Sequence, residues 1–233
     1  MEARRKTGTE NVSRSGGDMQ PARLGESEVV PTYSRLAPRY DSWAALSESR
    51  ARRRCLELAA VQNGETILEV AAGTGLLFVE LLKLNPDGVT EGVDLTEAML
   101  MKARRKAARL GAGNYCLLVG DARHLDYPAD RFDLLINNYM FDLLPESDFA
   151  TILEGFKRVL RPGGRMVLAN MTKPEHWYQA LWEGLYRLRP SLMGGCRGVQ
   201  LLPFVESAGF QSVRREVVSQ MTFPSEVIYG VKP

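Results

Sequence analysis

Residues 67–75 read ILEVAAGTG, and this stretch decides the fold of the chain. An apolar run that contains Glu69 ends in the turn Gly73-Thr74-Gly75, and residues 76–84 then show the apolar spacing of a helix. This order predicts a buried strand, a tight turn and a helix that opens at the turn. Gly73 and Gly75 lack a Cβ, so a nucleoside ligand could lie directly against the main chain.

Two kinds of nucleotide-binding fold share this strand–turn–helix unit. In the dinucleotide-binding fold the turn reads GxGxxG, and here Phe78 stands at the third glycine position, where it would block the close approach of helix and strand. Glu69 also places an acid near the turn, which suits a ligand with a positive charge or a free amine. S-adenosylmethionine carries both. The remaining alternative is a plain strand–helix turn without a ligand.

A second acid follows the next predicted strand, residues 89–93. Asp94 stands at its carboxyl end, about 20 residues after the glycine turn, where a ribose-binding carboxylate lies in dinucleotide-type folds. The alternative is that Asp94 only caps the following helix. Thr96 is the expected N-cap of that helix, and Met99 is expected on its inward face.

Two more strand ends carry polar residues. Residues 117–119 form a predicted strand that ends in Gly120-Asp121-Ala122, where Asp121 could accept a hydrogen bond from an adenine amino group. Residues 134–137 form an apolar central strand with Asn138 and Tyr139 at its carboxyl end, where ligands bind in open α/β sheets. A helix over 149–160, a Pro-Gly-Gly turn at 162–164 and a strand over 165–170 complete the pattern.

These four pieces resemble the class I S-adenosylmethionine-dependent methyltransferases, and more narrowly the ubiquinone/menaquinone C-methyltransferase family and its small-molecule relatives. The resemblance covers residues 30–233 and includes YSRLAPRYDSW at 33–43, which in that family forms a helix over the cofactor. Met140-Phe141-Asp142-Leu143 replaces the Gly-Leu-Arg-Asn-like stretch of the quinone enzymes. The resemblance and the pattern together imply cofactor contacts from Tyr33, Tyr40, Glu69, Ala71, Gly73, Thr74, Gly75, Asp94, Leu95, Met99, Asp121, Ala122, Asn137 and Asn138.

The segment 171–202 is expected to form a substrate cap. Helical spacing places Tyr178, Trp182 and Tyr186 on one face, either as core packing or as the wall of an apolar pocket. The expected substrate contacts are Tyr139, His176, Tyr178 and Arg197. Methyl transfer depends mainly on in-line positioning, so a base is needed only if the acceptor loses a proton. The candidates for that role are Tyr139, Asp142 and His176.

Composition supports one enzyme domain. The 233 residues have 45% hydrophobic and 25% charged content, and a net charge of +2 makes no case for nucleic acid. Three scattered cysteines predict a reduced, cytoplasmic protein without a metal site. Residues 1–28 hold few large apolar side chains and are expected to be a disordered tail, followed by the domain 29–233. Arginine and lysine clusters at 50–54 and 102–109 form either a solvated face or a contact with an anionic membrane.

The predicted architecture is a Rossmann-like, doubly wound α/β domain. Its seven-stranded sheet is mostly parallel, and a hairpin of 211–219 with 227–231 adds an antiparallel last strand. Pro38 is expected to divide 33–43 into two short helical pieces that close over the cofactor, with Tyr33 or Tyr40 at its methionine end. The predicted function is methyl transfer from S-adenosylmethionine to a small, largely apolar acceptor. The alternatives are a phospholipid or amine N-methyltransferase at a membrane surface and an inactive cofactor-binding module. The oligomeric state is left open.

Overall fold

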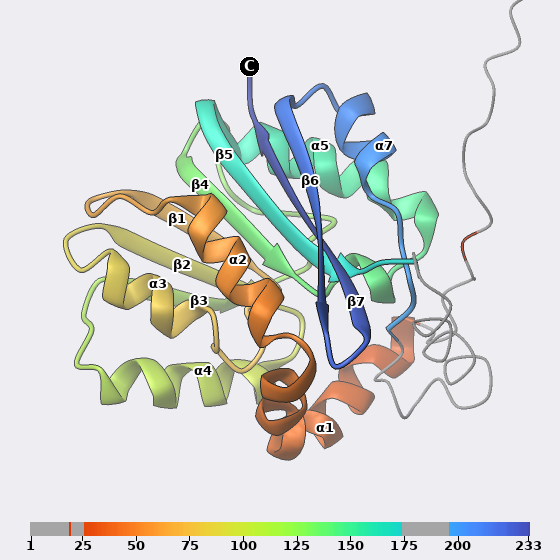
Figure 1. Ribbon diagram of the computed structural model, residues 1–233. Coiled ribbons are helices and arrows are strands. Elements are labelled where there is room, and N and C mark those ends of the chain that lie inside the picture. The colour runs from red at the N-terminus through yellow and green to blue at the C-terminus, as the bar shows by residue number, and fades with distance from the viewer. Residues whose placement is uncertain (1–18, 20–25, 174–195) are drawn as a thin grey trace, which may run out of the picture.

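The computed structural model describes residues 19, 26–173 and 196–233, apart from the side chains of 26–29, 36–40 and 43. Within these residues seven strands form one sheet in the order β3-β2-β1-β4-β5-β7-β6 (Figure 1). Strands β1 to β5 are parallel, whereas β7 runs antiparallel to both β5 and β6. Their bounds are β1 Thr66–Val70, β2 Val89–Asp94, β3 Tyr115–Val119, β4 Phe132–Asn138, β5 Leu160–Met171, β6 Gln211–Gln220 and β7 Phe223–Val231. The predicted mostly parallel sheet with an antiparallel terminal hairpin is confirmed.

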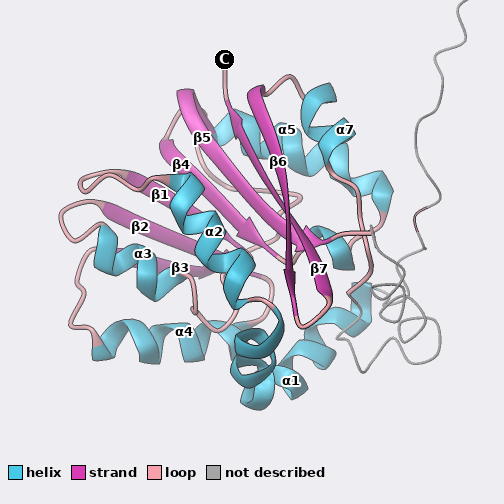
Figure 2. Ribbon diagram, in the orientation of Figure 1, coloured by secondary structure: helices cyan, strands magenta, loops and turns pink. Residues whose placement is uncertain are grey.

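Helices cover both faces of the sheet (Figure 2). Strand β4 lies at its centre, and its side chains alternate between two cores: Leu135 packs with α5, whereas Leu134 and Ile136 pack with α2. The described helices are α1 Glu26–Ser47, α2 Ser49–Ala59, α3 Phe78–Leu84, α4 Glu97–Arg109, α5 Phe149–Val159 and α7 Leu202–Ser207, with 3-10 turns η1 Phe141–Leu143 and η2 Glu146–Asp148.

The N-terminal helices differ from the prediction. Helix α1 runs without a break through Pro38 and begins at Glu26, inside the segment expected to be a tail. Proline removes only its own N–H from the helix, and the hydrogen bonds on either side can keep it continuous. Helix α2 starts at Ser49, because the chain turns at Glu48 between α1 and α2.

Strand β5 starts five residues earlier than predicted. Leu160 already pairs with Phe132, so the Pro-Gly-Gly stretch lies inside the strand as an irregular segment. Gly163 has φ +76°, and its N–H donates to the carbonyl of Lys232 while Gly164 accepts from the N–H of Lys232, each at 2.9 Å. The glycines therefore pair with the chain that follows β7 rather than only ending α5.

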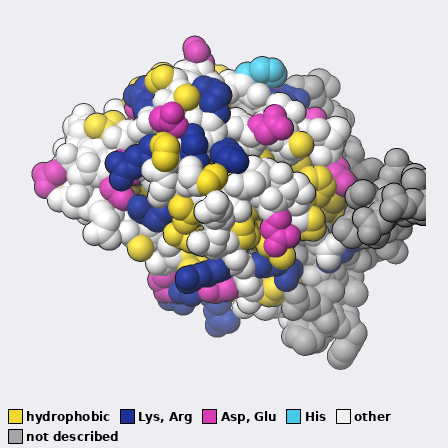
Figure 3. All heavy atoms as spheres, turned by 90° about the horizontal axis from the view of Figure 1, so that it is seen from above, with side chains coloured by type: hydrophobic (Ala, Val, Ile, Leu, Met, Phe, Trp, Pro, Cys, Tyr) yellow, Lys and Arg dark blue, Asp and Glu magenta, His cyan; other side chains and the backbone are white. Residues whose placement is uncertain are grey.

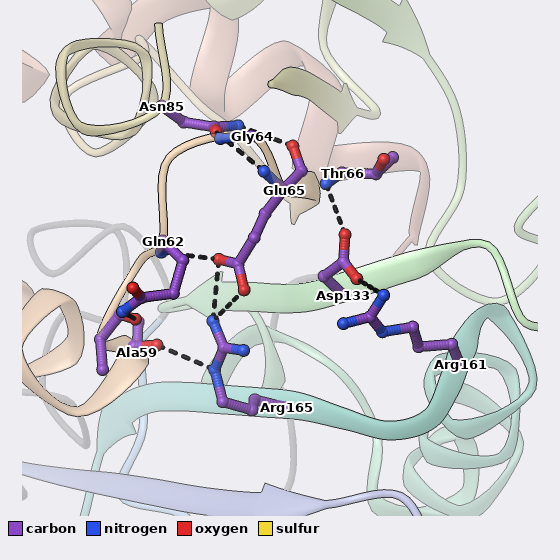
Figure 4. A network of polar contacts seen from close by, with 10 residues as sticks. Ala59, Gln62, Gly64, Glu65, Thr66, Asn85, Asp133, Arg161 and Arg165 are labelled. Atoms are coloured by element: carbon purple, nitrogen blue, oxygen red, sulfur yellow. Dashed lines mark hydrogen bonds and ion pairs between the residues drawn. The ribbon is translucent and has the colours of Figure 1, made fainter. Parts of the chain in front are cut away.

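A polar network holds the amino ends of β1 and β5 in register with α2 and α3 (Figure 4). Arg165 on β5 donates to the Ala59 carbonyl at 3.0 Å and to the Glu65 carboxylate at 2.9 Å. The side chain of Asn85, at the end of α3, accepts from Glu65 N–H and donates to the Glu65 carbonyl. These contacts fix the start of β1 and so the position of the glycine turn at its other end.

Acidic and basic side chains are interspersed over this amino-terminal end of the central strands (Figure 3). Asp133 accepts from Thr66 N–H at 2.7 Å and is paired with Arg161, and Lys232 is paired with Asp130. The candidate site lies at the opposite end, where β1, β2 and β4 finish.

Candidate active site

A cavity of about 110 Å³ lies at the carboxyl ends of β1, β2 and β4. This is the edge where ligands bind in doubly wound sheets, because β1 and β4 are neighbours from which the connections leave in opposite directions. The residues that line the cavity are Tyr33, Val70, Ala71, Gly73, Val93, Asp94, Leu95, Thr96, Met99, Gly120, Asp121, Ala122, Arg123, Asn138, Tyr139, Met140, Leu143 and Leu144.

Two non-glycine residues in the cavity wall have left-handed backbone. Ala71 follows β1 with φ +56°, and Tyr139 follows β4 with φ +54°. Such conformations cost about 1–3 kcal/mol each and cluster at functional sites. Both strand ends therefore turn sharply at the cavity, which brings their main chains close to any ligand.

The two glycines of the turn have different roles. Gly73 lines the cavity with φ +55°, and a Cβ there would meet nothing closer than 4.0 Å, so its surface is open. Gly75 does not line the cavity. A Cβ on Gly75 would lie 2.7 Å from the Ala103 side chain and 2.8 Å from its Cα, so helix α4 packs directly on this residue. The absence of a Cβ at Gly75 is therefore required by helix packing, and its expected contact with the ligand stays a prediction.

Phe78 shows how the chain departs from the GxGxxG pattern. Its ring is fully buried and would lie 3.0 Å from a Cβ on Gly92 in β2. The phenylalanine thus fills the space between α3 and β2, and the glycine that permits close approach stands on the strand instead of the helix.

Asp94 organises the main chain around the cavity. One carboxylate oxygen accepts from Gly73 N–H and the other from Thr96 N–H, each at 2.8 Å. Burial raises the pKa of Asp94, and these two backbone hydrogen bonds oppose that shift. Asp94 thus supports the turn before α4, as the capping alternative requires, and it also lines the cavity, as the ribose-binding alternative requires.

Asp121 lies at the end of β3 and is held by Arg123. The guanidinium donates to both carboxylate oxygens at 2.7–3.0 Å, and Arg123 N–H donates to one of them at 2.9 Å. Burial raises the pKa of Asp121, but Arg123 outweighs that effect and lowers it. Asp121 is therefore an anion at neutral pH.

Behind the glycine turn lies a second, smaller chamber of about 40 Å³. Glu69 from β1, Arg52 from α2 and Glu48 from the break before α2 meet there, and Ala71, Gly73, Asn138 and Tyr139 line both spaces. Glu69 is 2% exposed and its Oε2 has no hydrogen-bond partner among the described residues. Burial, and then the charge of Asp94, raise the pKa of Glu69 well above its ordinary value, while Arg52 lowers it. A buried carboxyl oxygen without a partner marks a place for a donor from a ligand.

Thr74 connects the glycine turn to helix α1. Its hydroxyl donates to Asp41 and accepts from Lys106, and Lys106 forms an ion pair with Asp41 at 2.7 Å. Lys106, together with the hydrogen bond from Thr74, lowers the pKa of Asp41 against the effect of burial. Thr74 lines only the second chamber, so its main contacts hold α1 beside the turn.

The three polar residues at the end of β4 separate into different environments. Asn138 lines both spaces and accepts from the Cys55 thiol at 3.3 Å, whereas Asn137 is fully buried and donates to the Val70 carbonyl at 2.8 Å. Asn137 thus does not line the cavity, and its expected cofactor contact stays a prediction. Tyr139 lines the cavity, but its hydroxyl pairs with Ser225 at 2.8 Å, and burial raises the pKa of Tyr139.

Asp142 and Arg197 lie beneath the cavity rather than in its wall. Asp142 is fully buried, and burial raises its pKa to about 7, while Arg197 opposes that shift. Arg197 is 2% exposed; its N–H donates to the Asp142 carbonyl and its guanidinium to the Leu144 carbonyl. Arg197 is thus buried and does not line the cavity, and its expected contact with substrate stays a prediction. Cys196 beside it is buried, 4.0 Å from the Tyr33 hydroxyl.

Several predicted residues cannot be placed. His176, Tyr178, Trp182 and Tyr186 lie outside the described residues, as does most of the expected cap. The side chain of Tyr40 lies outside them as well, whereas Tyr33 lines the cavity.

Sequence reasoning missed four charged residues at the site. Arg52 stands in an arginine-rich run that resembles a solvated face, and nothing in the sequence marks Glu48. Asp41 lies in the segment 33–43, but only its tyrosines were expected at the cofactor. In Arg123 alone the sequence offers a signal, because it follows Asp121 at the spacing of an Asx turn.

Several basic residues of the two clusters form ion pairs within the fold. Arg54 pairs with Glu216 and Glu57, Arg104 with Glu97, and Lys106 with Asp41. In the described part of the chain, no helix is long and apolar enough to cross a membrane. Nor do the described His, Cys, Asp and Glu side chains form a group of three that could hold a metal ion.

Comparison with known proteins points to one chemistry. Residues 67–164 match a family model described as a methyltransferase domain. An arsenite methyltransferase of Halobacterium salinarum is 30% identical over 156 residues, which cover 66% of this chain and 39% of that protein. A demethylmenaquinone methyltransferase of Thermus thermophilus is 35% identical over 146 residues, which cover 61% and 65%. The matched part of the chain thus covers about two fifths of the length of the first relative and just under two thirds of the length of the second.

Among solved structures, the [4+2]-cyclase SpnF superposes with a TM-score of 0.73 at 17% identity, covering 93% of this chain and 99% of that one. At this identity the likeness concerns the fold alone. It agrees with the sheet order and with the position of the cavity.

Proposed function

We propose, starting from the class I methyltransferase domain that this chain carries, that the protein transfers a methyl group from S-adenosylmethionine to a small, largely apolar acceptor. The observation that carries the proposal is a cavity with one carboxylate at each of two strand ends, Asp94 and Asp121, next to a chamber lined by Glu48, Glu69 and Arg52.

The residues present fit S-adenosylmethionine. Asp94 keeps free lone pairs for ribose hydroxyls after accepting two backbone hydrogen bonds, and Asp121 and Ala122 line the end of the cavity expected for adenine. In the second chamber, Glu69 would accept from the amino group of the methionine end and Arg52 would pair with its carboxylate. The buried, unsatisfied oxygen of Glu69 is the observation that supports this assignment.

When bound, S-adenosylmethionine supplies an activated methyl group on a sulfonium. The protein's own part is positioning: the left-handed turns at Ala71 and Tyr139 shape the wall, and α1 covers the cavity through Tyr33. Asp142 does not line the cavity, and the Tyr139 hydroxyl is engaged by Ser225. We therefore assign no general base among the described residues, and an acceptor that loses a proton on methylation would release it to water.

The nature of the acceptor follows from the wall beside the end of β4. Met140, Leu143 and Leu144 form it, with Tyr33 opposite on α1. Such a surface favours an apolar, ring-shaped acceptor of the quinol type, in agreement with the demethylmenaquinone methyltransferases among the relatives. Arg54, Arg104 and Lys106 of the basic clusters are paired within the fold, so these three charges are less available to an anionic membrane, and the apolar wall favours the quinol-type acceptor over a phospholipid.

The test is transfer from methyl-labelled S-adenosylmethionine to a panel of acceptors: a reduced naphthoquinone, a phenol, a primary amine, a thiol, arsenite and phosphatidylethanolamine vesicles. We expect label in the quinol product, and loss of transfer in Asp94→Asn but not in Asp126→Asn, which changes an exposed carboxylate. Label only in the vesicles, in arsenite or in no acceptor would contradict the proposed substrate class.

A further inference from the structure

Arg123 lies at the boundary between two surfaces. It lines the cofactor cavity together with Asp121 and also lines a wider groove beside α5, formed with His124, Asp126, Thr151, Glu154 and Arg158. Its side chain is 20% exposed, so it is a wall of the cavity and not a freely solvated arginine.

The guanidinium of Arg123 occupies the acceptor capacity of Asp121. One carboxylate oxygen accepts from Arg123 N–H at 2.9 Å and from Nε at 3.0 Å, and the other accepts from Nε at 3.0 Å and from a terminal nitrogen at 2.7 Å. A carboxylate offers about four lone-pair positions. The single Nε hydrogen is shared between the two oxygens, so three N–H donors occupy most of the acceptor positions of Asp121.

An adenine amino group would have to share this carboxylate with the guanidinium, which already spans both oxygens. The backbone donor of Arg123 belongs to the turn and stays in place, so only the guanidinium can make room. Nucleoside binding and the Arg123–Asp121 ion pair thus compete for one carboxylate.

A second carboxylate stands next to Arg123. Asp148, at the start of α5, lies 3.6 Å from another terminal nitrogen of the guanidinium and is 21% exposed, against 31% for Asp121. This separation is beyond a hydrogen bond but within reach of a small side-chain rotation. If Arg123 moved toward Asp148, the charge would stay paired and Asp121 would face the cavity.

We propose that Arg123 is a specificity-determining residue that passes from Asp121 to Asp148 when an adenine nucleoside binds. The inference rests on the proposed function, since it takes the cavity to be the cofactor site. Its consequence is that the wild-type affinity for the cofactor is set by two carboxylates that share one arginine.

The test is a double-mutant cycle read by calorimetric titration of S-adenosylhomocysteine into the full chain. Arg123→Met keeps the length of the side chain but removes its donors, and Asp148→Asn keeps the shape of the second partner. We expect Arg123→Met to tighten binding about threefold to tenfold, in line with a partly buried, forked ion pair. Asp148→Asn should weaken binding about threefold in the wild-type background and leave it unchanged in the Arg123→Met background. Arg105→Met, which removes a charge from the exposed face of α4, should leave affinity unchanged.

Weaker or equal binding by Arg123→Met would overturn the proposal, because it would mean that the arginine stays with Asp121 or contacts the ligand. An equal effect of Asp148→Asn in both backgrounds would overturn it as well. Either result leaves the proposed function standing, provided that wild-type protein binds. Absence of binding in all variants, with folding verified by circular dichroism, would instead reject the cofactor assignment and the inference with it.

Discussion

Replacing Asp94 by asparagine separates its structural role from its binding role. The two carboxylate oxygens accept from Gly73 N–H and Thr96 N–H at 2.8 Å each. Asparagine has one acceptor oxygen, and its amide nitrogen would face the second N–H donor. One of the two hydrogen bonds to a charged group is then lost, at about 1.5–3 kcal/mol.

Part of that loss is offset. Burial raises the pKa of Asp94, so removing the charge also removes a cost of desolvation. The expected net fall in the free energy of unfolding is about 1–2 kcal/mol. Binding should suffer more, because a ribose that meets a neutral amide loses at least one charge-assisted hydrogen bond, which corresponds to a fall in affinity of about ten- to a hundredfold.

Urea unfolding followed by circular dichroism measures the first quantity, and calorimetric titration of S-adenosylhomocysteine measures the second. Asp126→Asn, at an exposed carboxylate, is the matched control. A variant that loses stability but binds the ligand with wild-type affinity would refute the ribose-binding role and leave Asp94 as a cap. Unchanged stability would refute the hydrogen-bond geometry around the turn.

Three further predictions concern the frame of the site. Gly75→Ala should lower the free energy of unfolding by more than about 1 kcal/mol, because its Cβ would meet Ala103 and its φ is +80°; unchanged urea unfolding would contradict the close packing. The pKa of Asp142 is raised from 3.8 to about 7, so between these pH values the folded state holds a proton that the unfolded state has lost. The free energy of unfolding should therefore fall as the pH rises from 3.8 to 7, by about 4 kcal/mol in all. Asp142→Asn should abolish most of this pH dependence, and a variant whose free energy of unfolding depends on pH as in the wild type would contradict the prediction. Asp41→Asn weakens the hydrogen bond with Thr74, so amide hydrogen exchange in α1 should become faster while β4 stays protected. Equal exchange rates in the variant and the wild type would show that this contact does not hold α1.

Much of the fold was predictable because its signals are local. Burial is indicated by two apolar runs, the one before Gly73 and the one in β4, while the acid Asp94 marks the end of β2. The order of these features along the chain limits the sheet to few topologies. Helix boundaries were less predictable, since the turn at Glu48 depends on how α1 packs over the sheet.

Residues at strand ends were the most predictable part of the site. Asp94 and Asp121 meet that condition and line the cavity. Gly75 and Asn137 stand beside such residues in the sequence but face a helix and a neighbouring strand, which only the packed structure reveals. Arg52 reaches the second chamber from a helix that precedes the sheet, so its role depends on tertiary packing and not on spacing.

The most direct test of the account is calorimetric titration of the wild-type chain with S-adenosylmethionine, S-adenosylhomocysteine and NAD. The account predicts saturable binding of both sulfur nucleosides, which fill the cavity and the second chamber. It predicts no binding of NAD, whose pyrophosphate would lie at the glycine turn beside the buried acid Glu69. Saturable binding of NAD, with none of S-adenosylmethionine or S-adenosylhomocysteine, would contradict the central claim.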